Sequence, residues 1–165
     1  MTADKIYLVG FMGAGKSTVA RALGRRLGWR AEDIDHLIEA HERRTVAAIF
    51  AQQGEAYFRQ VERLVLGELL PLRHVIVATG GGTFAEPDNQ ALMLADGAVA
   101  WLDLTFNQVV ARLPPDGRRP LAADRVQLEQ LYLKRQMAYA HAHVRVDGSA
   151  PVAAVVERLL EWVGY

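Results

Sequence analysis

The chain has 165 residues, the size of one ordinary domain, and about half of them are hydrophobic, which is enough to build a core. Its 19 Lys and Arg residues equal its 19 Asp and Glu residues, so bulk charge gives no argument for nucleic acid or membrane as a partner. The absence of cysteine excludes disulfides, thiolate metal sites and a cysteine nucleophile. No apolar run suits a signal peptide or a membrane span, so we expect a cytoplasmic monomer with one domain, residues 1–165.

Short apolar runs that predict strands alternate along the chain with helical patterns. The predicted extended segments are 6–9, 29–34, 74–78, 98–102 and 144–146. Helices are predicted at 16–27, 36–70 with breaks near Thr45 and Gly54, 89–94, 107–113, 126–142 and 151–162. Strands that are apolar on both faces and separated by helices indicate a parallel sheet covered on two sides. We therefore predict a three-layer α/β/α fold with a five-stranded parallel sheet.

A glycine loop, GFMGAGKST at 10–18, lies between the first predicted strand and the first predicted helix. Gly10, Gly15, Lys16 and Ser17 match the pattern G-x-x-x-x-G-K-[ST]. In such a loop, backbone N–H groups surround phosphate oxygens, the lysine reaches the β- and γ-phosphates, and the hydroxyl ligates Mg²⁺. A glycine-rich turn without a ligand is the competing interpretation, but the motif and its strand–loop–helix context favour a nucleotide site. The loop does not identify the phosphoryl acceptor.

Two carboxylates, Asp33 and Asp35, lie at the end of the second predicted strand. With a period of two residues, both project from one face towards the carboxyl edge of the sheet, where α/β ligands bind. One carboxylate could hold the water shell of Mg²⁺ and the other could accept a proton from an attacking hydroxyl. The alternative is that they cap the helix that starts near His36. The neighbouring phosphate loop favours the functional interpretation.

Three consecutive glycines, Gly80, Gly81 and Gly82, follow the strand at 74–78. They allow a close approach of backbone to a small ligand, although a tight turn explains them equally well. Arg59 and Glu62 lie three residues apart on one helical face. They could form a surface ion pair, or Glu62 could hold Arg59 so that its guanidinium binds the carboxylate of a ligand.

Arginines also surround residues 114–117, PPDG, which predict a mobile surface loop. Arg112, Arg118 and Arg119 bracket this segment, and Arg135 lies on the next helix. A lid over a phosphoryl-transfer site requires a loop of this kind, since closure excludes water and supplies charge. Solvated surface positions remain the alternative for these arginines. The pair His141 and His143 is typical of ordinary surface rather than of a metal site.

Taken in order, these segments resemble the shikimate kinase family, whose members are small and have the nucleoside-monophosphate-kinase-like P-loop fold. Residues 10–28 are similar to the family's first loop and helix, and DIDHLIE at 33–39 to its D-[ST]-D-x-x-I-E. IFAQQGEAYFRQVE at 49–62 is similar to I-F-x-x-x-G-E-x-x-F-R-x-x-E. ATGGG at 78–82, the spacing from Arg112 to RPL at 119–121, and KRQMAY at 134–139 follow in the same order, so the resemblance covers nearly the whole chain.

The resemblance implies that the protein transfers the ATP γ-phosphoryl group to the 3-hydroxyl of shikimate, with Mg²⁺ as cofactor. The residues that it implies for ATP are Gly13, Ala14, Gly15, Lys16, Ser17, Thr18 and, near the adenine, Arg112. Ser17 and Asp33 would support the metal. Lys16, Asp35 as the base, and Arg119 from the lid would be catalytic.

For the acceptor, the resemblance implies contacts from Asp35, Arg59 and Arg135 together with the backbone of Gly80, Gly81 and Gly82. The acceptor-binding segment would span about 34–61 and the lid about 112–124. Scattered arginines without net basic charge then have an explanation, because they would neutralise one small anion and a triphosphate.

The sequence departs from the family pattern at several positions. Ile34 replaces a small hydroxyl residue, and Arg43 stands where the family has glycine. If that position is left-handed, arginine costs about 1 kcal/mol there; otherwise the helix break has moved. Ala122 follows RPL in the lid, Gln90 follows Asn89 in place of an arginine, and no proline follows Arg135.

Two alternatives to the shikimate kinase interpretation remain at this point. One is a kinase for another small hydroxy acid such as gluconate, since two arginines suit either carboxylate. The other is a nucleotide-binding regulatory module that has lost catalysis. The retention of Asp33, Asp35, Arg59, Arg119 and Arg135 argues against the second alternative.

Overall fold

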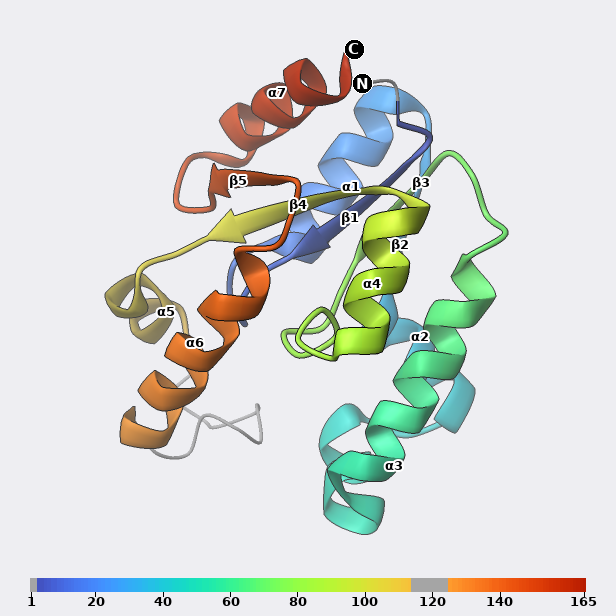
Figure 1. Cartoon of the computed structure of the whole chain (residues 1–165), viewed down its shortest axis with the longest axis vertical. Coiled ribbons are helices and arrows are strands. Elements are labelled where there is room, and N and C mark those ends of the chain that lie inside the picture. Colours follow the sequence, from blue (N-terminus) through green and yellow to red (C-terminus); the bar gives the residue numbers. More distant parts are fainter. Residues whose placement is uncertain (1–2, 114–124) are drawn as a thin grey trace.

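The computed structural model describes residues 3–113 and 125–165, so the predicted lid arginines Arg118 and Arg119, and the departure at Ala122, lie outside the described residues. In chain order the elements are β1 (Lys5–Val9), α1 (Lys16–Leu27), β2 (Arg30–Asp33), α2 (Ile34–Glu42), α3 (Val46–Leu69), β3 (Val75–Ala78), α4 (Pro87–Asp96), β4 (Ala98–Asp103), α5 (Phe106–Arg112), α6 (Arg125–Tyr139), β5 (Val144–Asp147) and α7 (Val152–Val163). Figure 1 shows their arrangement.

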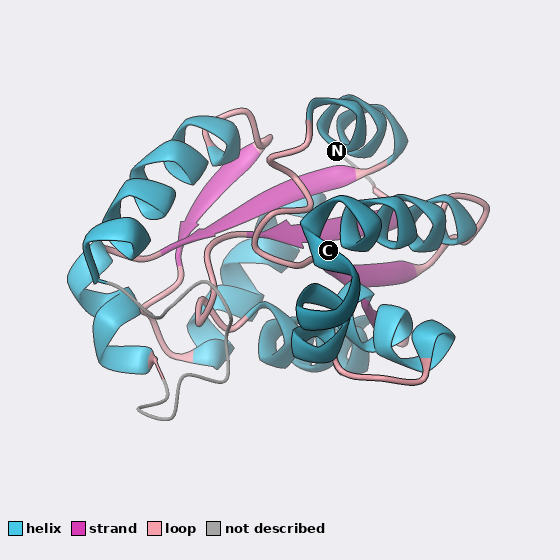
Figure 2. Ribbon diagram, turned by 90° about the horizontal axis from the view of Figure 1, so that it is seen from below, coloured by secondary structure: helices cyan, strands magenta, loops and turns pink. Residues whose placement is uncertain are grey.

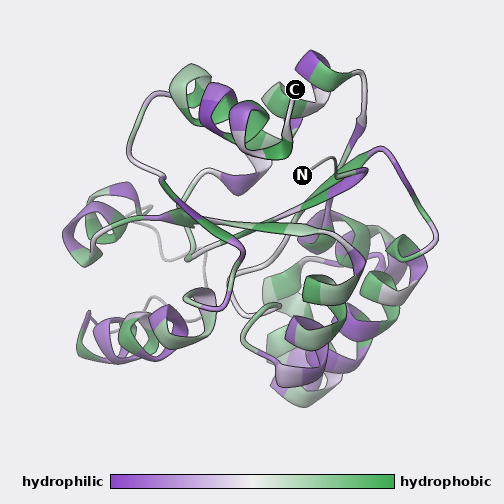
Figure 3. Ribbon diagram, turned by 45° about the horizontal axis from the view of Figure 1, so that its top comes forward, coloured by the Kyte–Doolittle hydropathy of each residue, from purple (hydrophilic) through white to green (hydrophobic). Residues whose placement is uncertain are grey.

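The five strands form one parallel sheet in the order β2-β3-β1-β4-β5. Helices cover both faces of this sheet (Figure 2), so the predicted three-layer fold with five parallel strands is confirmed. α1 packs against α7 on one face, and α3 and α4 lie on the other (Figure 3). All residues of β1 and β3 are buried, whereas the edge strands β2 and β5 carry exposed polar residues. The apolar runs of the inner strands therefore form the core between two helical layers.

The junction between β2 and α2 differs from the expected one. The helix begins at Ile34 rather than near His36, because Asp33 is its N-cap and accepts a hydrogen bond from the His36 N–H at 3.2 Å. Asp35 therefore lies in the first turn of a helix and not in a strand. The expectation that a period of two places both carboxylates on one strand face was wrong.

The predicted helix breaks near Thr45 and Gly54 are confirmed. Thr45 is the N-cap of α3 and accepts from the Ala48 N–H. Gly54, with φ 82° and ψ 176°, kinks α3 at a backbone conformation that a helix does not contain. Arg43, between α2 and α3, has φ 55° and ψ 37°, so the helix break has not moved and the arginine occupies a left-handed position.

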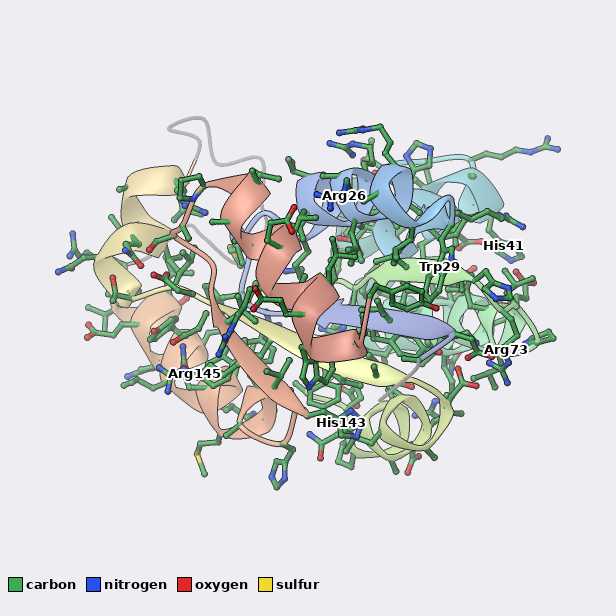
Figure 4. All side chains as sticks on the ribbon, turned by 90° about the horizontal axis from the view of Figure 1, so that it is seen from above. Arg26, Trp29, His41, Arg73, His143 and Arg145 are labelled. Carbon is green, nitrogen blue, oxygen red and sulfur yellow. The ribbon has the colours of Figure 1, made fainter. Side chains whose placement is uncertain are left out.

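A buried polar cluster lies at the amino end of the sheet. The Lys5 side chain is fully buried, and its Nζ donates to Asp96 Oδ2 at 2.7 Å and to the carbonyls of Leu69 and Leu70 at 2.9 Å. Tyr7 also donates to Asp96 Oδ2, and Arg73, labelled in Figure 4, donates to its other oxygen. This cluster joins β1 to the carboxyl ends of α3 and α4.

α3 and α6 extend beyond the carboxyl ends of the strands (Figure 1). The glycine loop follows β1, Asp33 is the last residue of β2, and the 80–82 glycines follow β3, so the fold gathers them at this edge. Among the described residues, none of the helices has both the length and the hydrophobicity that crossing a membrane requires.

Candidate active site

The glycine loop connects β1 to α1 as the motif predicts. Gly15 is the N-cap of α1 in a left-handed conformation, with φ 85°, and no side chain caps this helix end. The first N–H groups of α1 are therefore left to face an anion. The Lys16 Nζ is held over the loop, where it donates to the Gly10 carbonyl at 2.5 Å and to the Phe11 carbonyl at 3.0 Å.

Ser17 and Asp33 form the part of the site that could hold a metal. The Ser17 hydroxyl donates to Asp33 Oδ2, while Asp33 Oδ1 caps α2. The capping interpretation of Asp33 is confirmed, and its role at a metal stays a prediction. Oxygen ligands of this kind fit Mg²⁺, which keeps several waters and binds through substrate phosphates and one or two protein groups. The described residues contain no group of three His, Cys, Asp or Glu side chains that could hold a metal ion.

Arg59 is held by a buried carboxylate. Its NH1 donates to Glu62 Oε1 at 2.9 Å, and the Glu62 side chain is fully buried while that of Arg59 is only 15% exposed. The alternative of a solvated surface pair is therefore wrong. The Arg59 Nε is buried and has no hydrogen-bond partner, and Oε1 of Glu86 lies 3.8 Å away from it. A ligand carboxylate could satisfy this orphan donor.

The second arginine of the predicted acceptor set, Arg135, is 6% exposed and comes from α6. Its guanidinium lies over the ring of Phe11 in the phosphate loop, 5.8 Å from the ring centroid. Burial lowers the pKa of Arg135, and the neighbouring Arg59 lowers it further. No carboxylate lies within ion-pair distance of Arg135 in the described part of the chain, so an anionic ligand could pair with this buried guanidinium.

The three glycines bring these groups together. A Cβ added to Gly80 would lie 2.8 Å from Asp35 Oδ1, one on Gly81 would lie 2.9 Å from Arg135 NH1, and one on Gly82 would lie 2.3 Å from Arg59 NH2. A residue with a side chain at any of these three positions would therefore displace one of these charged groups. The segment is also a turn, closed by hydrogen bonds from Thr83 N–H to the Gly80 carbonyl and from Ala85 N–H to the Gly82 carbonyl. The two interpretations of the triple glycine are therefore compatible.

The glycine turn and the side chains around it, Asp35, Arg59 and Arg135, lie next to the phosphate loop. The added Gly81 Cβ would be 3.7 Å from the Met12 backbone nitrogen, and Arg135 packs on Phe11. The structure thus brings Asp35, Arg59, Arg135 and the glycine turn to one place beside the phosphate loop, although 100 residues separate Asp35 from Arg135. Their individual roles remain predictions.

Arg112 lies on the opposite side of the phosphate loop. Its NH1 donates to the Gly13 carbonyl at 3.0 Å and its NH2 to the Gly148 carbonyl at 3.5 Å. The residues that flank Gly148 border an open hollow of about 470 Å³, which Asp103, Thr105, Gln108, Arg145, Asp147 and Ser149 line. Arg145 is labelled in Figure 4. Arg119, the predicted lid residue, lies outside the described residues.

Sequence reasoning missed two residues of this region. Tyr139 donates from its hydroxyl to the Gly81 carbonyl, and burial raises its pKa, so the hydroxyl stays protonated. Thr83 donates to Glu62 Oε2 at 2.8 Å. No spacing rule points to either residue, because each contact joins distant parts of the chain.

Two departures from the family pattern have visible substitutes. Gln90 donates to the carbonyls of Phe84 and Ala138, which links the segment after the glycine turn to α6. Without a proline after Arg135, α6 simply continues to Tyr139.

A parallel sheet of this order, a phosphate loop after its central strand, and two buried arginines at a glycine turn beside that loop define an ATP-dependent P-loop kinase of the nucleoside-monophosphate-kinase-like fold. A family model described as shikimate kinase matches residues 12–164. The chain belongs to the shikimate kinase family.

Known proteins agree with this assignment. A shikimate kinase of Persephonella marina is 41% identical over 157 residues, which cover 93% of this chain and 96% of the relative. The structure of a shikimate kinase from Acinetobacter baumannii in complex with shikimate matches this one with a TM-score of 0.93 and 34% identity. The match covers 98% of this chain and 93% of the Acinetobacter baumannii chain. A gluconokinase from Sinorhizobium meliloti, with 17% identity, a TM-score of 0.65 and coverage of 96% and 90%, shares the fold alone.

Proposed function

We propose that the protein is a shikimate kinase, which transfers the γ-phosphoryl group of ATP to the 3-hydroxyl of shikimate and forms shikimate 3-phosphate and ADP. The observation that carries this proposal is the convergence of Arg59 and Arg135 on the glycine turn beside the phosphate loop. A planar carboxylate matches the fork of a guanidinium, so two buried guanidinium groups suit an acceptor that carries one. Membership of the family supports shikimate as that acceptor.

In the proposed reaction, the acceptor carboxylate is anchored by Arg59, Arg135 and the backbone of the glycine turn. This anchoring aims the acceptor hydroxyl at the γ-phosphorus, and Asp35 orients the hydroxyl and accepts its proton. The new bond forms between the hydroxyl oxygen and phosphorus, while the bond to the β–γ bridging oxygen breaks and its electrons stay with ADP. Lys16 neutralises charge on the transferring group, so positioning and charge neutralisation provide most of the catalysis.

Mg²⁺ completes the proposed site. Ser17 would bind it directly and Asp33 through water, and the bound ion supplies positive charge to the β- and γ-phosphate oxygens. The residues 34–61 would serve as the acceptor-binding segment, and 112–124 as a lid that contributes Arg119, with Arg112 on the adenine side. We propose that residues 1–165 act as a single, monomeric kinase domain.

An acceptor panel tests this proposal. Release of ADP from Mg-ATP is measured in a coupled assay with shikimate, with gluconate and with no acceptor, and is repeated after chelation of the metal. We expect turnover that depends on shikimate and is lost with EDTA. Turnover with gluconate alone would identify the other hydroxy-acid kinase, and ATP binding without turnover on any acceptor would identify a regulatory module.

A further inference from the structure

Thr83 is the first residue after the three glycines, and its side chain is fully buried. Its hydroxyl accepts a hydrogen bond from the Gly80 N–H at 3.0 Å and donates one to Glu62 Oε2 at 2.8 Å. The other oxygen of Glu62, Oε1, accepts from Arg59 NH1 at 2.9 Å. The Gly80 backbone, Thr83, Glu62 and Arg59 are therefore joined by three consecutive hydrogen bonds.

This chain of hydrogen bonds fixes how Arg59 uses its donors. Glu62 holds only the NH1 prong, and the Nε of Arg59 has no hydrogen-bond partner. NH2 faces Gly82 and makes one long hydrogen bond, 3.4 Å, to Oε1 of Glu55, whose side chain is 60% exposed. A buried carboxylate with a free oxygen would draw a second guanidinium prong, because both groups prefer the bidentate arrangement. Thr83 occupies that oxygen, so Glu62 anchors Arg59 without consuming its fork.

The same hydroxyl orients the glycine turn. It engages the Gly80 N–H, whereas the N–H groups of Gly81 and Gly82 make no hydrogen bond within the described part of the chain. Two adjacent backbone donors are thus left beside Arg59 and Arg135.

We propose that Thr83 is a positioning residue for the anionic end of the phosphoryl acceptor. Through Glu62 it keeps the Arg59 fork open, and through Gly80 it presents the next two backbone donors to the same carboxylate. Thr83 touches neither substrate and acts through these groups. The inference rests on the proposed function, since the acceptor used to test it is shikimate.

The test compares Thr83→Val, which keeps the shape and removes the hydroxyl, with Thr83→Ser, which keeps the hydroxyl. Steady-state rates are measured with shikimate and ATP varied in turn, and shikimate binding is measured by calorimetry. We expect Thr83→Val to raise KM and Kd for shikimate about tenfold, the effect of one buried hydrogen bond. The kcat and the KM for ATP should stay within about twofold, and Thr83→Ser should restore the wild-type values.

Thr79→Val is the matched control. Thr79 is also buried, and its hydroxyl donates to the Leu8 carbonyl at 3.0 Å rather than to Glu62. It should lower the melting temperature to a similar extent and leave the KM for shikimate unchanged. If Thr83→Val does not fold, Thr83→Ala removes the same hydroxyl with less steric demand and carries the same expectation.

The outcomes separate this inference from the proposed function. An active wild-type protein whose Thr83→Val variant keeps its KM for shikimate, or whose Thr83→Ser variant behaves like Thr83→Val, overturns the positioning role alone. A folded wild-type protein that neither binds nor phosphorylates shikimate overturns both.

Discussion

Arg59 and Arg135 are both buried, yet their surroundings shift their pKa values in opposite directions. Burial lowers the pKa of Arg59, but Glu62, with smaller contributions from Glu55 and Glu86, outweighs this and raises it. Burial also lowers the pKa of Arg135, and the carboxylates near it are too distant to reverse the effect. Both guanidinium groups remain protonated at any ordinary pH. Arg59 therefore has a carboxylate partner of its own, whereas Arg135 has none among the described residues and could pair with an acceptor carboxylate.

Arg59→Ala should weaken shikimate binding about a hundredfold and leave the KM for ATP unchanged, because it removes a desolvated charged hydrogen bond to the acceptor alone. The melting temperature should fall too, since Glu62 is then buried without its ion-pair partner. Titration calorimetry with shikimate and kinetics with varied ATP check the two expectations. Arg63→Ala is the control, because the ion pair of Arg63 with Asp88 lies at the surface and both side chains are more than half exposed. Equal shikimate affinity in the wild-type and Arg59→Ala proteins would remove Arg59 from the acceptor site.

The sequence predicts residues that follow a motif far better than residues that act through space. Lys16 and Ser17 could be predicted because consecutive positions on one loop fix their geometry. Arg59 and Arg135 needed the family resemblance, since surface arginines have the same local pattern. Thr83 and Tyr139 could not be predicted, because their partners Glu62 and Gly81 lie far along the chain and only the folded sheet brings them together.

At the scale of elements, the structure differs from the sequence-based prediction at the ends of helices. The apolar pattern predicts the buried strands well, but a helix boundary depends on one capping side chain. Asp33 caps α2 and starts that helix earlier than the pattern indicates, which moves Asp35 from a strand to a helical turn. Asp35 still lies beside Gly80, so it stays a predicted site residue, but the geometric argument that pointed to it is wrong.

The connection between α2 and α3 offers a test of backbone strain. Arg43 has a left-handed conformation that costs a residue with a Cβ about 1–2 kcal/mol, and no hydrogen bond or ion pair of its side chain is found among the described residues. Arg43→Gly removes this strain but makes the unfolded chain more flexible, so we expect a net gain of about 0.5–1 kcal/mol in the free energy of unfolding. Urea denaturation measures this difference.

His41→Gly is the matched control for that measurement. His41 is exposed in the last turn of α2, where the backbone is right-handed, and glycine there should cost about 1 kcal/mol. If both substitutions destabilise the protein, the left-handed position is not strained.

At the scale of the whole molecule, the two ends of the sheet have different tasks. The carboxyl end gathers the phosphate loop and the proposed acceptor residues, whereas the amino end holds the cluster of Lys5, Tyr7, Arg73 and Asp96. Burial alone would raise the pKa of Asp96, but hydrogen bonds from Lys5, Tyr7 and Arg73 outweigh it and lower the pKa below its ordinary value. The ionised carboxylate is therefore the form that stabilises the fold.

The pH dependence of unfolding checks this assignment. Because the pKa of Asp96 is lower in the folded state, its contribution is complete above the unfolded value of about 3.9 and disappears as the pH falls through the folded value. Asp96→Asn should cost about 3 kcal/mol at pH 7, since it leaves the buried Lys5 without a carboxylate. The difference from wild type should shrink below about pH 4. Urea denaturation at several pH values measures it.

Glu157→Gln provides the comparison for Asp96→Asn. It removes a surface ion pair with Arg26, in which both side chains are about half exposed, and should change stability by less than about 1 kcal/mol. A constant difference between wild type and Asp96→Asn from pH 7 to pH 3 would show that the charge of Asp96 is not what stabilises the cluster.

The uncompensated charge of Arg135 has a consequence for the engineering of this protein. Nearly all of its side chain is buried, on an aromatic ring and against a glycine turn, with no carboxylate beside it in the described residues. An apolar side chain such as Met would fill that space without a desolvated charge. Selection for heat resistance alone would therefore favour Arg135→Met. We expect this variant to have a higher melting temperature and to lose its affinity for the acceptor. If Arg135 binds the acceptor as proposed, stability and acceptor binding make opposite demands on this one position.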